Sequence, residues 1–97
     1  MKVIIVGAGE VGYHIASRLA AESKQVVVID KNPEAIRRVA ENLDVQTMLA
    51  SGSSPAVLEE AGIKSAEILL AVTNSDESNL VSCLVSNMLS PNTKKLA

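Results

Sequence analysis

A glycine-rich hexapeptide constrains the fold of this chain more than any other feature of its sequence. The segment Gly7–Gly12 has the form G-x-G-x-x-G and directly follows the apolar run 3–6. The pattern alone is weak, but a strand before it and a helix after it give the context in which it marks a dinucleotide-binding turn. A glycine-rich strand–helix turn that binds no ligand is the alternative interpretation.

Each glycine of the motif has its own predicted role. Gly7 permits the tight turn, Gly9 lets a diphosphate approach the backbone because it lacks a Cβ atom, and Gly12 lets the helix lie close to the strand. The N–H groups and partial positive charge at a helix N-terminus favour the diphosphate. The predicted cofactor-binding residues here are Gly7, Ala8, Gly9, Glu10, Val11 and Gly12.

Four apolar runs (3–6, 26–29, 45–49 and 68–72) alternate with segments of helical spacing. The first, second and fourth runs are continuous, as in parallel strands covered on both faces, whereas the mixed third run fits a sheet edge. The alternation predicts an α/β fold, a Rossmann-type doubly wound parallel sheet in the order 3-2-1-4. Leu96-Ala97 resembles the start of a fifth strand, so we expect one nucleotide-binding domain over 1–97, truncated at its C-terminus and part of a longer chain.

The helical segments differ in their apolar patterns. In the first, Val11, Ile15 and Leu19 form one stripe, and Pro55 is predicted to begin a short third helix. The last helix, about 76–89, has an apolar band that is wider than one sheet-facing stripe requires. Its members are Leu80, Val81, Leu84, Val85, Met88 and Leu89. This helix is either deeply buried or packs on a second subunit, and the second alternative predicts a homo-oligomer, a dimer or tetramer.

Composition excludes several classes of partner. The net charge of −2 argues against nucleic acid, which requires clustered positive charge, and Tyr13 is the only aromatic residue on which a base could stack. The single cysteine, Cys83, fits a reducing cytosol. The longest apolar runs are about five residues, against the ~20 of a membrane span. We therefore expect a cytoplasmic protein without direct membrane insertion.

Asp30 ends the second strand, 18 residues after Gly12. A carboxylate at this place accepts hydrogen bonds from the adenosine ribose and repels a 2′-phosphate, which favours NAD or another adenine nucleotide over NADP. The neighbouring Lys31 is also a predicted site residue, because a lysine can bind a phosphate. Alternatively, Asp30 caps the helix that starts near Pro33.

Two further loops lie on the same edge of the predicted sheet. Ser51 and Gly52 follow the third strand and either pass close to an adenine ring or simply form a turn. Thr73 and Asn74 follow the fourth strand and are predicted to reach a ribose or the second nucleotide half. Ser75 or Asp76 is expected to cap the helix that follows.

The remaining polar residues give no sign of catalysis. His14 is predicted to lie on the first helix with no carboxylate around it, and Arg37 and Arg38 are predicted to form a solvated helix face. Cys83 is expected to be a small core residue. No metal-ligand spacing is present, and we expect a binding protein rather than an enzyme.

Taken together, the runs KVIIVGAGEVG, VVVID, VLEEAGI and AEILLAVTNSDESNLVSCLV resemble the N-terminal nucleotide-binding domain of TrkA-type proteins, also called the KTN or RCK domain. The resemblance covers essentially the whole chain. It implies a regulatory subunit on the inner face of the cell membrane that binds NAD or NADH and acts on an integral membrane potassium transporter. In relatives, the ligand can be ATP or ADP.

The resemblance also carries over specific positions. The family's nucleotide contacts fall on Gly7 to Val11, on Asp30, and on Thr73-Asn74. Where many members have a Gly-Asp pair after the third strand, this chain has Ala50-Ser51. A family arginine on the fifth strand, which can approach the phosphates, lies beyond Ala97. Two alternatives remain: the cofactor domain of an NAD-dependent oxidoreductase, and an ATP- or ADP-binding regulatory module of a related potassium channel or transporter.

Overall fold

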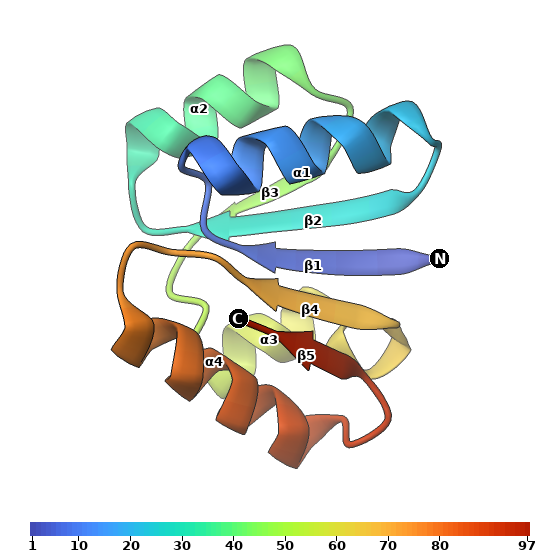
Figure 1. Cartoon of the computed structure of the whole chain (residues 1–97), viewed down its shortest axis with the longest axis vertical. Helices are drawn as coiled ribbons and strands as arrows, with labels where there is room; N and C mark the ends of the chain where they lie inside the picture. Colours follow the sequence, from blue (N-terminus) through green and yellow to red (C-terminus); the bar gives the residue numbers. More distant parts are fainter.

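The computed structural model describes residues 1–97 and contains one parallel sheet in the order β3-β2-β1-β4-β5 (Figure 1). The strands are β1 Lys2–Val6, β2 Gln25–Asp30, β3 Gln46–Leu49, β4 Ile68–Ala71 and β5 Lys94–Leu96. The predicted order and the edge position of the third strand are confirmed. The fifth strand begins at Lys94, two residues earlier than predicted, because Lys94 already lies beside Ile68.

Helices cover both faces of the sheet (Figure 1). On one face lie α1 Glu10–Ala21 and α2 Pro33–Asn42; on the other lie α3 Pro55–Glu60, the 3-10 turn η1 Ile63–Ser65 and α4 Asp76–Leu89. The predicted bounds of the last helix are confirmed. None of the helices reaches the length and apolarity that crossing a bilayer takes.

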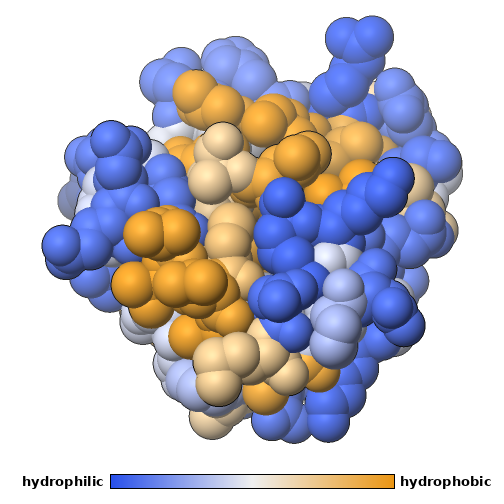
Figure 2. Space-filling model, turned by 60° about the horizontal axis from the view of Figure 1, so that its bottom comes forward, coloured by the Kyte–Doolittle hydropathy of each residue, from blue (hydrophilic) through white to orange (hydrophobic).

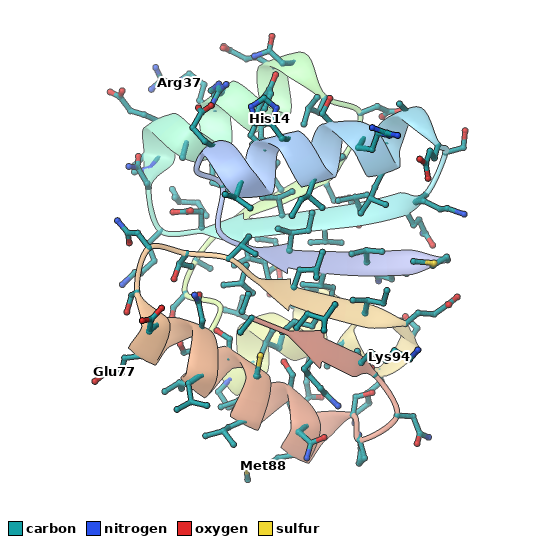
Figure 3. The ribbon with its side chains drawn as sticks, in the orientation of Figure 1. His14, Arg37, Glu77, Met88 and Lys94 are labelled. Atoms are coloured by element: carbon teal, nitrogen blue, oxygen red, sulfur yellow. The ribbon has the colours of Figure 1, made fainter.

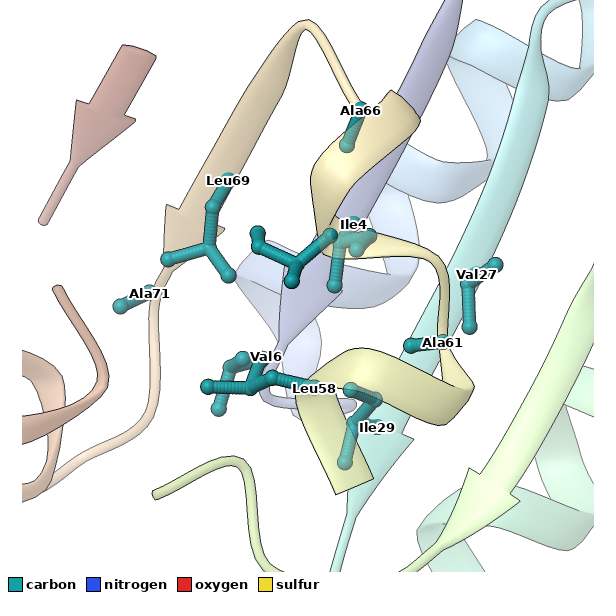
Figure 4. Close-up of a cluster of buried hydrophobic side chains, with 10 residues drawn as sticks. Ile4, Val6, Val27, Ile29, Leu58, Ala61, Ala66, Leu69 and Ala71 are labelled. Atoms are coloured by element: carbon teal, nitrogen blue, oxygen red, sulfur yellow. The ribbon is translucent and has the colours of Figure 1, made fainter. Parts of the chain in front are cut away.

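Two aliphatic clusters hold these layers together. The cluster beneath α3 and α4 includes Ile4, Leu58 and Leu69 (Figure 4). The cluster beneath α1 and α2 includes Ile5 and Val39. Successive β1 residues alternate between the two clusters, since side chains along a strand point to opposite faces. This is why the central apolar runs are continuous rather than alternating.

The first turn of α1 departs from the predicted stripe. Gly12 and Ala16 are the buried residues of α1, and Ile15 and Leu19 pack against the core. Val11, by contrast, is 58% exposed. Within this first turn Gly12 faces β1, whereas Val11 faces the space at the carboxyl ends of the strands.

Candidate functional site

The loops that follow β1, β2, β3 and β4 surround one cleft of about 870 Å³ at the carboxyl ends of the strands. This is where doubly wound sheets bind ligands, and the volume falls within the range of small-molecule sites. Ten of the predicted site residues line it: Gly7, Gly9, Glu10, Val11, Asp30, Lys31, Ser51, Gly52, Thr73 and Asn74. Ala8 and Gly12 do not line the cleft.

The N-terminus of α1 is the one helix start at this edge without a side-chain cap. The N-cap of α1 is Gly9, and no side chain accepts from its first turn. In α2, α3 and α4, the side chains of Asn32, Ser54 and Ser75 accept hydrogen bonds from first-turn N–H groups. Since the first N–H groups of a helix have no intrahelical partner, those of α1 are available to an anion.

The geometry at each glycine matches its predicted role. Gly7 has a φ of +119°, which side-chain-bearing residues rarely adopt. A Cβ atom on Gly12 would lie 1.8 Å from the carbonyl oxygen of Gly7, so only glycine allows α1 to approach the loop this closely. A Cβ atom on Gly9 would meet nothing within 4 Å. Gly9 therefore borders open space in the cleft, which fits a bound diphosphate.

Asp30 holds the glycine loop in place. Its Oδ2 atom accepts a hydrogen bond of 2.7 Å from the backbone N–H of Ala8, and its Oδ1 atom accepts one of 2.8 Å from that of Asn32. Ala8 thus contributes through its amide to Asp30. The helix cap is Asn32, not Asp30, because the Asn32 side chain accepts from the N–H groups of Glu34 and Ala35. Each Asp30 oxygen retains a lone pair for a ribose hydroxyl.

The loop after β4 is organised by a residue that the sequence analysis missed, Asn79. Its Oδ1 accepts from the backbone N–H of Thr73 at 3.0 Å and from the Thr73 hydroxyl at 2.6 Å, and its Nδ2 donates to the Thr73 carbonyl at 3.1 Å. The Thr73 hydroxyl also accepts from the Ser75 N–H. These internal bonds occupy the polar groups of Thr73, whereas Asn74 is exposed to the cleft.

A polar residue on the inner face of an apolar helix was the signal for Asn79, since α4 buries Asn79, Ser82 and Ser86. The two capping alternatives for this helix are also resolved. Ser75 is the N-cap, and its hydroxyl accepts from the N–H of Ser78 at 3.1 Å. Asp76 is the first residue of the helix instead.

The loop after β3 forms a turn and lines the cleft at the same time. Gly52 is buried, and a Cβ atom there would lie 2.3 Å from Cγ1 of Val6. The hydroxyl of Ser51 accepts a hydrogen bond from the Ser53 N–H at 3.2 Å. Gly52 therefore lets this loop close down over the end of β1, and Ser51 stabilises the turn.

The sequence-based predictions for His14 and Arg38 are both wrong, because each of these side chains lies beside Glu10. His14 does have a carboxylate beside it, because Nε2 of His14 lies 3.4 Å from Oε2 of Glu10, one helical turn earlier. Arg38 is not simply solvated either: its Nη1 lies 2.7 Å from Oε1 of Glu10, and its guanidinium lies 3.9 Å from the centre of the Tyr13 ring. Arg38 hydrogen bonding and charge lower the pKa of the Glu10 carboxyl.

The outer face of α4 is apolar. Leu80, Val81, Leu84 and Met88 are exposed, Met88 to 82%. Figure 2, which brings the α4 side of the molecule forward, shows apolar side chains gathered on this surface. Val85 and Leu89 pack against the core, as does Cys83, whose pKa is raised by burial. The prediction of a deeply buried helix is therefore wrong for the four exposed side chains.

The sequence of this chain is similar to a family model and to known proteins. The family model described as the TrkA-N domain matches residues 3–97. The Trk system potassium uptake protein TrkA of Halomonas elongata is 41% identical over 97 residues, covering all of this chain and 21% of that protein. That of Azorhizobium caulinodans is 47% identical over 89 residues, covering 92% of this chain and 19% of that protein. The chain spans about a fifth of the length of these relatives.

Solved structures agree on the fold. The Kef C-terminal domain of Shewanella denitrificans, in an AMP-bound form, has a TM-score of 0.84 at 22% identity. The match covers 98% of this chain and 57% of the Kef domain chain. The TrkA-N domain of the Escherichia coli inner membrane protein ybaL has a TM-score of 0.84 at 20% identity. The match covers 97% of this chain and 69% of the ybaL chain. With the family model matching nearly every residue, this chain belongs to the TrkA-N domain family.

Proposed function

We propose that this chain is the nucleotide-binding regulatory domain of a Trk-type potassium uptake system and that it binds NAD or NADH without catalysing a reaction. The uncapped first turn of α1 carries this proposal, because it lies at the open space beside Gly9 and beneath the loop that Asp30 holds. The relatives named for potassium uptake support the transport role. The AMP-bound structural neighbour supports an adenine nucleotide as the ligand class.

The ionisable side chains of the cleft favour binding over catalysis. Glu10 is held in an ion pair with Arg38, and both oxygens of Asp30 accept backbone N–H bonds. Lys31 is exposed at the rim, where its charge favours phosphates. These groups organise the loop and balance charge. The oxidoreductase alternative predicts hydride transfer. An assay of the absorbance of the reduced nicotinamide, with the complete protein and candidate substrates, would detect it.

The proposed partner of the exposed apolar face is a second copy of the chain. Leu80, Leu84 and Met88 recur every four residues on α4, the spacing of a helix-packing stripe. No charged residue lies between Leu80 and Leu89, so two such faces meet without charge repulsion. Isologous pairing of this kind is the commonest symmetry of homo-oligomers.

The cleft and the apolar face share one helix. Ser75, Ser78 and Ser82 of the α4 segment line the cleft, while Leu80 and Leu84 lie on the outer side of the same turns. A ligand that contacts this helix can therefore favour one arrangement of paired domains, and through it one state of a membrane transporter on whose cytoplasmic side the domain sits. A differential affinity of about 1–3 kcal/mol is enough for such coupling.

Titration calorimetry with NADH, NAD, ATP and ADP tests the ligand. We expect saturable binding to the chain, with NADH or NAD the tightest, and loss of most of that affinity in Gly9→Val. Because a Cβ atom at Gly9 would meet nothing within 4 Å, the variant should remain folded by circular dichroism. Unchanged NADH affinity in folded Gly9→Val would show that the diphosphate binds elsewhere. Pull-down of a potassium-transporting membrane subunit with the complete protein tests the partner.

A further inference from the structure

Glu10 puts a negative charge inside the loop that is proposed to bind phosphates. It is the first residue of α1, it lines the cleft, and its side chain is 73% exposed. An acidic side chain in the first turn is itself attracted by the partial positive charge of the helix N-terminus. Glu10 and a bound diphosphate therefore compete for the same helix end, and they repel each other.

Arg38 of α2 removes this conflict in the structure. Its Nη1 donates a 2.7 Å hydrogen bond to Oε1 of Glu10, across 28 residues of sequence. The guanidinium is fixed from a second side by the ring of Tyr13, at 3.9 Å from the ring centre, a favourable cation–π distance. On the far oxygen of the carboxylate lies His14, at 3.4 Å. Glu10 is thus neutralised and held by groups that do not themselves line the cleft.

We propose that Arg38 is a positioning residue for the nucleotide's phosphates, acting through Glu10: it holds and neutralises the Glu10 carboxylate so that the glycine loop accepts a second anion. The inference rests on the proposed nucleotide binding. It assigns α2 a part in ligand affinity although Arg38 makes no contact with the cleft. The repulsion it relieves is electrostatic, so its effect depends on ionic strength.

A double-mutant cycle with ADP and NADH as probes, measured by calorimetry at low ionic strength, tests this role. Arg38→Gln should weaken binding of both ligands by about three- to fivefold, the size of one unscreened charge contact at a solvated surface. In the Glu10→Gln background, the same Arg38 substitution should have a clearly smaller effect, because no carboxylate is then released toward the phosphates. The affinity of Glu10→Gln/Arg38→Gln should equal or exceed that of the unmodified chain.

Arg37→Gln is the matched control. It removes the same charge from the neighbouring position, on the outer surface of α2, where Arg37 makes no ion pair (Figure 3). We expect unchanged affinity in Arg37→Gln and recovery of most of the affinity in Arg38→Lys. At about 1 M salt, where the Debye length falls to ~3 Å, the Arg38→Gln effect should shrink below twofold.

Several results would overturn the inference while leaving nucleotide binding intact. An equally large loss from Arg38→Gln in the Glu10→Gln background means that Arg38 acts on the phosphates by its own charge and not through Glu10. A loss that does not change with salt means that Arg38 only supports the α1–α2 packing. Equal affinity of Arg38→Gln and the unmodified chain means that Glu10 needs no compensation. If the unmodified chain binds neither ADP nor NADH, the proposed function itself is wrong.

Discussion

The helices that follow the two central strands, α1 after β1 and α4 after β4, are built in opposite ways. In α1 the buried positions hold small residues, Gly12 and Ala16, and charged side chains such as Arg18 face solvent. In α4 the buried positions are the polar Asn79, Ser82 and Ser86, whereas Leu84 and Met88 are exposed. Both helices border the same cleft, so the proposed binding of a nucleotide there does not by itself account for the contrast.

The contrast supports the proposed pairing of two chains through α4, in which the two helices would have different neighbours. α1 has the water-facing surface of an ordinary amphipathic helix, and its special demand is close approach of its backbone to the glycine loop. α4 packs its polar inner face on the sheet and exposes an apolar outer face, and a patch of this kind is typical of an interaction site. Four substitutions test this difference, from the largest expected effect to the smallest.

Gly12→Val should unfold or strongly destabilise the chain, because its Cβ atom would overlap the Gly7 carbonyl oxygen, which belongs to the backbone and cannot turn aside. We expect the free energy of unfolding in urea to fall by about 3 kcal/mol or more. Gly9→Ala, three residues earlier in the same motif, should cost at most about 1 kcal/mol. Equal costs at the two positions would contradict the close-packing role of α1.

Asn79→Ala should lower the free energy of unfolding by about 2 kcal/mol, because the N–H and C=O groups of Thr73 lose their partner. Asn74→Ala, on the same loop but exposed, should change it by less than about 0.5 kcal/mol. Chemical denaturation of both variants makes the measurement. An equal, small effect would mean that the polar inner face of α4 contributes nothing to holding the loop.

Leu84→Glu should weaken self-association at least about tenfold, roughly 1.4 kcal/mol, because it places a charge in the proposed apolar contact. Sedimentation velocity over a concentration series measures the dimer. Arg18→Glu on the exposed face of α1 is the control and should leave association unchanged. A chain that sediments as a monomer at every concentration, before any substitution, would refute pairing through α4.

Ser86→Ala should leave stability unchanged or raise it by up to about 1 kcal/mol, since the buried Ser86 hydroxyl has no hydrogen-bond partner to lose. Thr93→Val provides the contrast. The Thr93 hydroxyl is also buried but donates toward the carbonyls of Ile63 and Ala66, so its removal should cost about 1–2 kcal/mol. Thermal unfolding of both variants distinguishes the two kinds of hydroxyl.

The sequence was sufficient for the strand order and for most of the cleft because both depend on local signals. Apolar runs predict the strands, and parallel strands necessarily bring the loops after them to one edge. Asp30, Thr73 and Gly9 therefore line the same cleft, as the sequence predicted. The error at Val11 arose because helical spacing says which residues share a face but not that the first turn of this helix borders an open cleft.

What the sequence could not show are contacts between side chains on separate elements. Arg38 and Glu10 lie 28 residues apart on two helices, and no periodicity links them. The hydrogen bonds of Asn79 to Thr73 depend on how the turn between β4 and α4 closes. Likewise, the hydrogen bond from Ala8 to Asp30 follows from the parallel register of β1 and β2, which only the folded sheet specifies.

The bond between Asp30 and the Ala8 amide has a consequence for kinetics. A loop already shaped by the chain's own groups loses little conformational freedom when an anion arrives, so association resembles the docking of rigid bodies rather than coupled folding. If the cleft binds a nucleotide as proposed, its association rate should depend on diffusion and charge, and variants of the cleft should differ chiefly in the dissociation rate. A regulator built this way would respond promptly to a change in nucleotide concentration, and the dissociation rate of the nucleotide would set its response time.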